Sequence, residues 1–264
     1  MTRVDSLNGT LKETSDGTHQ RGGGSWVRRL RALGRAEWLQ FTRNRLLVFL
    51  ALLFPTVLPL FVWLAGGRAV EATAVAGEIF ILFALAFGVY YPALSMAVTR
   101  RDEGVLKRLR TGEARDWEIL SAIALPLAAA MLFLTVVIVV GFSAGAGAWP
   151  VNPVLILLAV VLGTAMSHGF ALLTSRFTPN AENAQITSMP VLMLLIFSQS
   201  ALRDLMPERI SQLLDRTPFA LAVDLFHARW FGEGGSWSQV IALIGWTVAL
   251  VWAGYQYMRW ETHR

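Results

Sequence analysis

The 264-residue chain contains no cysteine. This absence excludes disulfide bonds and every metal, haem or redox site that depends on a thiolate ligand. Charged residues are also scarce: Asp, Glu, Lys and Arg make up 16% of the chain, whereas soluble domains carry about a quarter. Mean hydropathy is +0.50. This composition indicates a chain whose main solvent is lipid.

The sequence also lacks the common motifs of enzymes. It has no G-x-x-x-x-G-K-[ST] loop that could hold ATP phosphates, and its four histidines form no H-E-x-x-H metal pair. Ser167 and His168 are adjacent, so on a helix their side chains project about 100° apart and cannot form a dyad. Asp102 and Glu103 alone are too few for a Mg²⁺ site of a lipid-phosphate transferase. We therefore expect no catalytic residues, no metal site and no cofactor bound by this chain.

Six stretches of 19 to 23 residues contain no charged side chain. A helix of about 20 residues spans the ~30 Å hydrocarbon core of a bilayer. We therefore predict an all-α membrane protein with six transmembrane helices. The predicted spans are 46–65, 79–99, 119–141, 153–173, 184–202 and 237–258.

The basic residues between these spans predict the orientation. Alternate connecting segments carry 18 Lys and Arg against 5 in the others, and the richer side is normally cytoplasmic. We expect a multi-pass protein of the cell membrane with both termini in the cytoplasm. Because membrane topology accounts for the excess of Lys and Arg, we expect no nucleic-acid partner. Residues 1–24 are polar and without periodicity, which predicts a disordered cytosolic tail before a membrane domain over 25–264.

Residues 25–45 form a basic amphipathic stretch just before the first span. Trp26, Leu30 and Phe41 share one helical face, with arginines elsewhere. Such a helix can lie in the lipid headgroup layer. An ordinary basic flank of a span is the alternative, at the same location.

Segment 203–236 is too apolar for a plain loop. Two apolar faces at helical spacing predict two short exofacial helices that re-enter the membrane before the last span; a cap on the membrane surface is the alternative. The first face has Ile210, Leu213 and Leu214, and the second has Phe219, Val223, Phe226 and Trp230.

Polar residues within the predicted spans are candidates for lining a transport pathway, because such groups are costly in lipid. Tyr90, Tyr91, His168 and Gln199 are these candidates. Hydrogen bonds between packed helices explain them equally well. No carboxylate falls within any predicted span.

The cytosolic segment 100–117 places Val105, Leu106 and Leu109 among many charges. As a short helix, it would present an apolar docking face with a charged rim to a soluble partner. A solvated basic loop is the alternative.

Four stretches together resemble the membrane permeases of type-2 ATP-binding-cassette (ABC) exporters. The most specific is RDEGVLKRLR at 101–110, which is similar to the family's E-x-G-T-L-K-R-L-R motif, with Val105 in place of Thr. The others are Glu37-Trp38 through Phe54-Pro55, Ala181-Glu182-Asn183-Ala184 with Pro190, and Pro218 with Val223-Asp224 and Arg229. After the fifth span the family's Ser-Gly-x-x-x-Pro is replaced by residues 198–203.

The resemblance implies a transporter subunit without its own ATPase. ATP and Mg²⁺ would bind a separate ABC ATPase subunit, and a second permease subunit, identical or related, would complete the pathway. An amphipathic drug, antibiotic or lipid-linked compound would be moved outward. A secondary transporter or a membrane scaffold is the alternative. The resemblance assigns coupling to the ATPase to Arg101, Glu103, Gly104, Lys107, Arg108 and Arg110.

Overall fold

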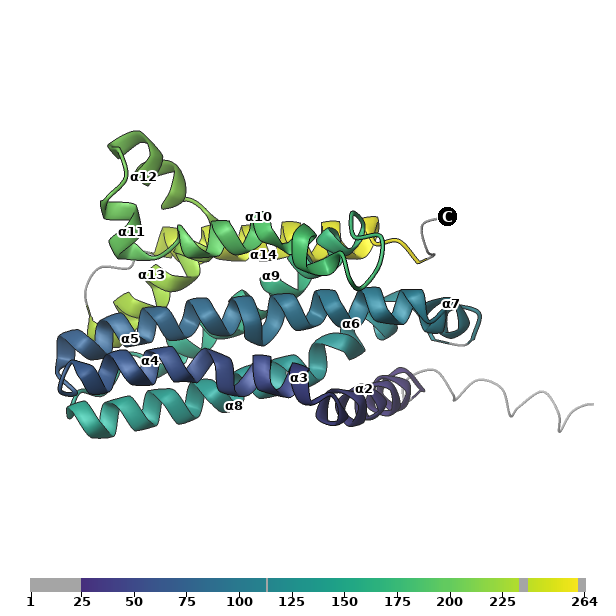
Figure 1. Ribbon diagram of the computed structural model, residues 1–264, viewed down its shortest axis with the longest axis horizontal. Helices are drawn as coiled ribbons and strands as arrows, with labels where there is room; N and C mark the ends of the chain where they lie inside the picture. The colour runs from purple at the N-terminus through teal and green to yellow at the C-terminus, as the bar shows by residue number, and fades with distance from the viewer. Residues whose placement is uncertain (1–24, 113, 233–236, 261–264) are drawn as a thin grey trace, which may run out of the picture.

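The computed structural model describes residues 25–112, 114–232 and 237–260. Every regular element in these ranges is helical (Figure 1). The predicted tail 1–24, Glu113 and residues 233–236 lie outside the described residues. The elements are α2 (Ser25–Arg43), α3 (Arg45–Val48), η1 (Phe49–Leu53), α4 (Phe54–Ala65), α5 (Val70–Phe83), η2 (Ala84–Tyr90), α6 (Tyr91–Asp102), α7 (Val105–Arg110), α8 (Asp116–Ala146), α9 (Pro153–Ser175), α10 (Ala184–Ile196), α11 (Ser200–Asp204), α12 (Glu208–Leu214), α13 (Pro218–Phe231) and α14 (Trp237–Tyr257).

Five continuous helices in the described ranges are long and apolar enough to cross a membrane. The chain is therefore an all-α, multi-pass membrane protein, as predicted. The five helices are Arg45–Ala65, Val70–Asp102, Asp116–Ala146, Pro153–Ser175 and Trp237–Tyr257.

The predicted span 184–202 is not one continuous helix. α10 has 13 residues, or about 20 Å at 1.5 Å per residue, less than the ~30 Å hydrocarbon core. It ends in a turn at which the Ser198 hydroxyl donates to the Leu194 carbonyl over 2.7 Å. Gln199 is extended (φ −66°, ψ 135°), and α11 begins after it. The prediction of six spans is therefore not confirmed in this segment.

The second predicted span, 79–99, is part of a longer helix. Glu78 interrupts the uncharged run just before residue 79, but the helix begins at Val70. Glu78 is buried and accepts a hydrogen bond from the Ser200 hydroxyl. A carboxylate therefore lies in a spanning helix, contrary to the sequence-based prediction, because tertiary hydrogen bonds offset the cost of its burial.

Two of the long helices contain a π-helical turn just before a proline. η1 precedes Pro55 and η2 precedes Pro92. Proline has no N–H and its ring displaces the carbonyl four residues earlier, which widens the preceding turn. η1 and η2 pack against each other. A Cβ at Gly88 would lie 3.5 Å from the Ala51 carbonyl oxygen, so the two widened turns are in close contact.

The centre of the bundle is α9, which α14, α13, α6 and α8 surround. α9 and α14 approach closely at two glycines. A Cβ on Gly169 would lie 2.7 Å from the Leu250 carbonyl carbon, and one on Gly254 would lie 2.6 Å from the Gly169 carbonyl oxygen. Small residues at such crossings allow backbone-to-backbone packing in membranes.

Both regions expected to hold short amphipathic helices do so. α2 is helical and packs on α8. In segment 203–236, α12 has no buried residue, whereas Phe219, Val223 and Phe226 of α13 are fully buried. The side chain of Trp230 lies outside what the structure describes. α13 is thus part of the core.

Candidate functional site

The short helix α7 lies at one end of the bundle (Figure 1). α6 ends at Asp102, and the chain reverses through Gly104, whose φ of +70° is readily adopted only by glycine. Leu106 is buried and holds α7 against the bundle, while Glu103, Lys107 and Arg108 are exposed. The predicted helix of segment 100–117 is therefore present and presents its charges outward.

Arg101, one of the predicted coupling residues, is instead buried beneath this helix. Its exposed fraction is 2%. Its guanidinium donates to the backbone carbonyls of Ser175 (2.8 Å), the last residue of α9, and of Thr178 and Pro179 (3.1 Å) in the loop that follows. The neighbouring Asp102 accepts from the backbone N–H of Ala181 over 3.1 Å. The segment before α7 is thus tied to the loop that leads into α10.

Two arginine–glutamate ion pairs connect α2 to the α7 end of the bundle. Arg100 pairs with Glu37 in a buried ion pair, and burial raises the pKa of Glu37 although the Arg100 charge lowers it in part. Arg29 donates two hydrogen bonds of 3.1 Å to Glu118. α2, α6 and α8 are therefore connected by charge as well as by apolar packing.

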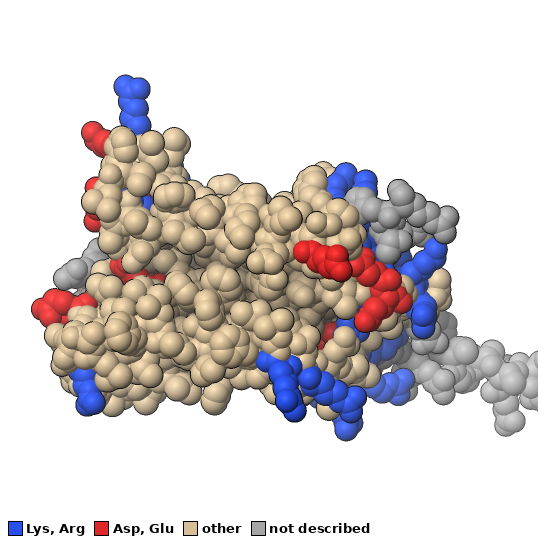
Figure 2. All heavy atoms as spheres, viewed as in Figure 1, with Lys and Arg blue, Asp and Glu red and all other residues tan. Residues whose placement is uncertain are grey.

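The surface of this end is basic. Figure 2 shows many Lys and Arg side chains at the α2 and α7 end together with a group of Asp and Glu side chains, while the broad middle of the visible face is uncharged. Arg110 is half exposed, lies 3.4 Å from Asp116 and stacks at 5.0 Å over the ring of Trp260. An exposed basic surface on a rigid base suits a soluble partner of opposite charge.

The predicted pathway residues are separated in the structure. Tyr90 is fully buried and donates to the Thr174 hydroxyl over 3.2 Å, and the next residue, Tyr91, is half-buried. His168 is buried and lines a groove between α8 and α14. Gln199 lies at a different groove, of about 260 Å³, between α10 and the α4–α5 pair. The four residues therefore form no single site.

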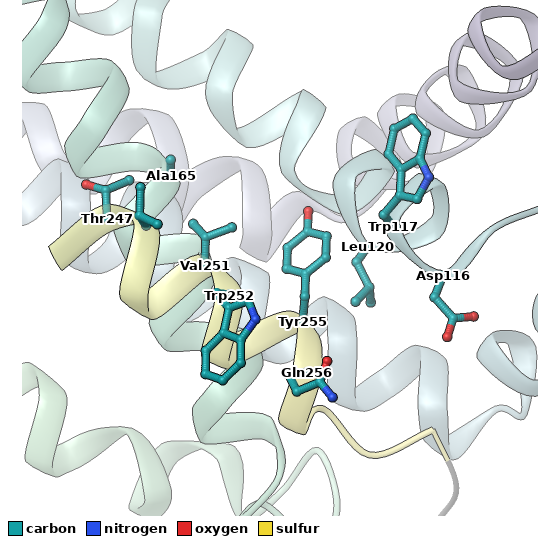
Figure 3. Close-up of a pocket in the computed structure, with 10 residues that line it drawn as sticks. Asp116, Trp117, Leu120, Ala165, Thr247, Val251, Trp252, Tyr255 and Gln256 are labelled. Atoms are coloured by element: carbon teal, nitrogen blue, oxygen red, sulfur yellow. The ribbon is translucent and has the colours of Figure 1, made fainter. Parts of the chain in front are cut away.

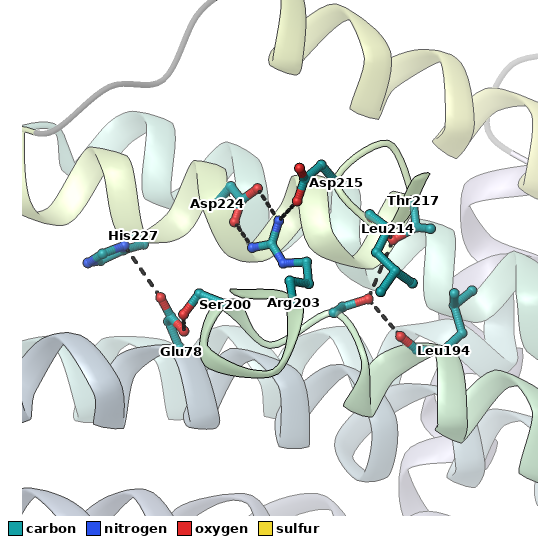
Figure 4. Close-up of polar contacts among 10 residues, drawn as sticks. Glu78, Leu194, Ser200, Arg203, Leu214, Asp215, Thr217, Asp224 and His227 are labelled. Atoms are coloured by element: carbon teal, nitrogen blue, oxygen red, sulfur yellow. Dashed lines mark hydrogen bonds and ion pairs between the residues drawn. The ribbon is translucent and has the colours of Figure 1, made fainter. Parts of the chain in front are cut away.

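A polar cluster at the opposite end was not predicted as a unit. Arg203 is buried and lies 2.6 Å from Asp215, and it also binds Asp224. Nearby, Glu78 accepts from Ser200 and lies 3.4 Å from His227 Nδ1 (Figure 4). The cluster joins α5, α11, the turn after α12, and α13.

The cluster is missed by sequence reading because its members are far apart in the chain and none forms a motif. Its sequence signal is that Glu78 and Arg203 are the charged residues directly next to two long uncharged runs. Within the described ranges, no three His, Asp or Glu side chains gather as metal ligands would.

Comparison with known proteins agrees with the helical, membrane-spanning architecture. No curated protein matches the chain. The model of the family described as "ABC-2 type transporter" matches residues 28–229, which include α2, the basic end and the Arg203 cluster. The chain belongs to the ABC-2 type transporter family and is a membrane component of an ABC transporter.

Proposed function

We propose that this chain is the permease subunit of an ATP-driven exporter in the cell membrane. In this proposal α7 lies in the cytoplasm and docks on a separate ABC ATPase subunit, which binds ATP and Mg²⁺. The chain itself carries no catalytic residue. Closure of the ATPase subunits would press on α7 and change the packing of the spans.

The observation that carries this proposal is the way α7 is mounted. Its outer face is basic and exposed, and its inner face is fixed by buried Leu106. Directly before it, Arg101 and Asp102 bind the loop 175–181. A displacement of α7 would therefore also move α6, the end of α9 and the start of α10. A solvated loop would need no such anchorage.

The path of the chain supports six crossings with both ends in the cytoplasm. α2 packs on α8 and Trp260 contacts Arg110, so both described ends of the chain lie beside α7. Beginning and ending on one side requires an even number of crossings. We therefore infer that α10, continued through the 197–199 turn into α11, completes the sixth. The basic surface makes this the cytoplasmic side, and α12 and α13 then dip into the outer leaflet.

The groove at Gln199 supports an amphipathic cargo and a second permease subunit. Its remaining lining is apolar, with Phe54, Phe83 and Phe87 on one side and Leu192 and Ile196 on the other. The outer faces of α4 and α10 expose large apolar side chains, among them Phe61 and Ile186. A second subunit, identical or related, would cover these faces and enclose the groove. The pathway so formed would accept a drug, antibiotic or lipid-linked compound for outward transport.

A second candidate, ion-coupled transport without ATP, is favoured by one observation. Glu78 is a buried carboxylate in a spanning helix beside His227, and such groups are common in ion-coupled transporters. Transport assays in proteoliposomes separate the two. Uptake that requires ATP and the ATPase supports the exporter, and uptake that follows a proton gradient without ATP contradicts it.

The docking role is tested by reversing two charges on α7. We expect Arg108→Glu with Arg110→Glu to weaken co-purification with the ABC ATPase by at least about tenfold, because opposed charges at an interface become like charges. The matched control is Arg28→Glu with Arg31→Glu, which reverses two exposed charges on α2 at the same end. Equal retention of the ATPase by both double variants would exclude docking through α7.

A further inference from the structure

Two helical segments of the membrane domain each expose an apolar stripe. One is the first span, from α3 through η1 to α4, and the other is α10. Along each stripe the exposed side chains recur every three or four residues, which places them on one side of the helix. They include Leu46, Phe49 and Leu53 in the first span, and Ile186, Met189 and Met193 in α10.

The two stripes lie on the same face of the bundle. In Figure 1, α10 lies on one side of α5 and α6, and α3–α4 lies on the other. The groove at Gln199 is between them, because Phe54 of α4 and Leu192 of α10 both line it. Within the described chain, 28% of the apolar part of the first span is buried, against 67% for the span Val70–Asp102. The face formed by the first span and α10 is therefore largely open.

Lipid chains can cover an apolar surface, so exposure alone does not identify the occupant. A groove of about 750 Å³ between α8 and α14 is an example (Figure 3). Asp116 is the one charged side chain among its described lining residues, and it already lies 3.4 Å from Arg110 of the same chain. That groove therefore offers no free charge with which a second protein could pair.

The face formed by the first span and α10 differs, because free charges lie at the α7 end of both stripes. Arg43 and Arg45 come just before Leu46, and Glu182 comes four residues before Ile186. All three charged side chains are exposed, and none forms an ion pair within the described ranges. Figure 2 shows basic side chains at the α3 end of this face and acidic side chains nearer α10. On one chain, α5 and α6 separate the two kinds of charge.

These charges favour a protein over lipid as the occupant. Anionic lipid headgroups attract the two arginines, but they repel the carboxylate of Glu182. A basic protein surface at the same depth would attract this carboxylate. Such a surface is present on the chain itself, at Arg43 and Arg45.

Symmetry brings the opposite charges together. Two copies of one chain have the same orientation in a bilayer, so a twofold axis that relates them runs along the membrane normal. Rotation about such an axis in front of this face places α10 of each copy on the first span of the other and leaves depth in the membrane unchanged. Glu182 of each copy then meets Arg43 and Arg45 of the other, which gives two identical sets of ion pairs.

We propose that the partner on this face is a second copy of the same chain. Arg45 and Glu182 pair reciprocally at the α7 end, and the two apolar stripes pack between the copies. Apolar contacts gain little over lipid in a bilayer, so the reciprocal charges select the identical partner. The proposal rests on the second subunit of the proposed function, which it identifies, and it involves neither ATP nor the ATPase.

Cysteine cross-linking of the full-length chain in phosphatidylcholine vesicles tests the contact between the stripes. Because the chain contains no cysteine, each introduced thiol reports one position. We expect a short bismaleimide to join Leu46→Cys of one tagged copy to Ile186→Cys of another. The control pair is Phe133→Cys on α8 and Val248→Cys on α14, which are similarly exposed. A yield for 46–186 no higher than that of the control pair would overturn the proposal.

Exchange of the charges between copies tests the ion pairs. In Arg45→Glu alone, and in Glu182→Arg alone, both reciprocal pairs become repulsive, so we expect dimerisation to weaken about tenfold. A mixture of the two variants again has opposite charges at both contacts, so its cross-linking should return to the wild-type yield. Misfolding of either variant could not produce this recovery. Arg28→Glu, an exposed reversal near the other end of α2, is the matched control and should dimerise normally.

The outcomes separate this proposal from the proposed function. A mixture that cross-links no better than the single variants would overturn pairing between identical copies. Cross-links that form only with a different permease would also overturn it, and would leave the ATP-driven exporter intact. Reciprocal recovery in vesicles without ATPase would support the dimer even if transport proved independent of ATP.

Discussion

The two ends of the bundle each contain a buried arginine, but the two arginines have different partners. Arg101 at the α7 end binds three backbone carbonyls and lies 3.7 Å from Asp102. Arg203 at the opposite end binds the carboxylates of Asp215 and Asp224. Both side chains are at least 90% buried, so both need strong partners.

This difference has consequences for the two ends. Three backbone carbonyls and the neighbouring Asp102 carboxylate hold Arg101, so this side chain mainly fixes the loop after α9 against α6. The two carboxylates neutralise Arg203 and come from separate segments. Arg203 therefore holds α11 and α13 together. Arg101 thus binds mainly backbone, whereas Arg203 is held by two carboxylates and joins separate segments.

The largest effect is expected from Arg101→Met. It leaves the carbonyls of Ser175 and Thr178 buried without donors. Because each bond to a charged donor contributes about 1.5–3 kcal/mol, we expect the free energy of unfolding to fall by about 4 kcal/mol. SDS titration in mixed micelles measures this, with exposed Arg108→Met as the control. A loss no larger than that of the control would show that Arg101 does not anchor the loop.

Arg203→Met is expected to cost slightly less, about 3 kcal/mol, because removing one partner of a buried ion pair leaves the other charge uncompensated and Asp215 is 47% exposed. The same titration applies. Arg203→Met with Asp224→Asn should recover part of the loss, since it removes the stranded carboxylate. If the double variant is less stable than the single variant, charge neutralisation is not what holds this end.

Arg100→Met is expected to have the smallest effect, up to about 2 kcal/mol, and to depend on pH. Burial already raises the pKa of Glu37 above its ordinary value of 4.5, and loss of Arg100 raises it further. A carboxyl that binds its proton more tightly when folded contributes stability below its unfolded pKa and loses it as pH rises through the folded pKa. The variant should therefore lose more stability at pH 8 than at pH 5.

Adding Glu37→Gln to Arg100→Met is the control for this prediction, because it removes the titrating group. The double variant should show no extra loss of stability at pH 8 relative to wild type. A pH dependence that survives in the double variant would mean that another group is responsible.

Predictions from the sequence were most accurate where a property is local. The ends of four uncharged stretches lie within about five residues of the ends of four long apolar helices. The spacing of Phe219, Val223 and Phe226 predicted a helix whose inner face is buried. Prediction was less accurate where an uncharged run ends inside a helix. Glu78 interrupts the uncharged run, but the helix continues through it to Val70.

The candidate site was only partly predictable for the same reason. The motif at 101–110 identified the α7 end, yet its residues were treated as one surface. The structure separates buried Arg101 from exposed Glu103, Lys107 and Arg108. Periodicity over ten residues cannot show this division, because the carbonyls that bind Arg101 lie about 75 residues away.

The sequence by itself determined that the chain is helical, lies in a membrane and has one strongly basic side, because hydropathy and charge act over a single helix. Only the tertiary structure decided which charges are buried and what they bind. Burial of Glu78, Arg101 or Arg203 becomes tolerable only when a distant segment supplies a hydrogen-bond or ion-pair partner.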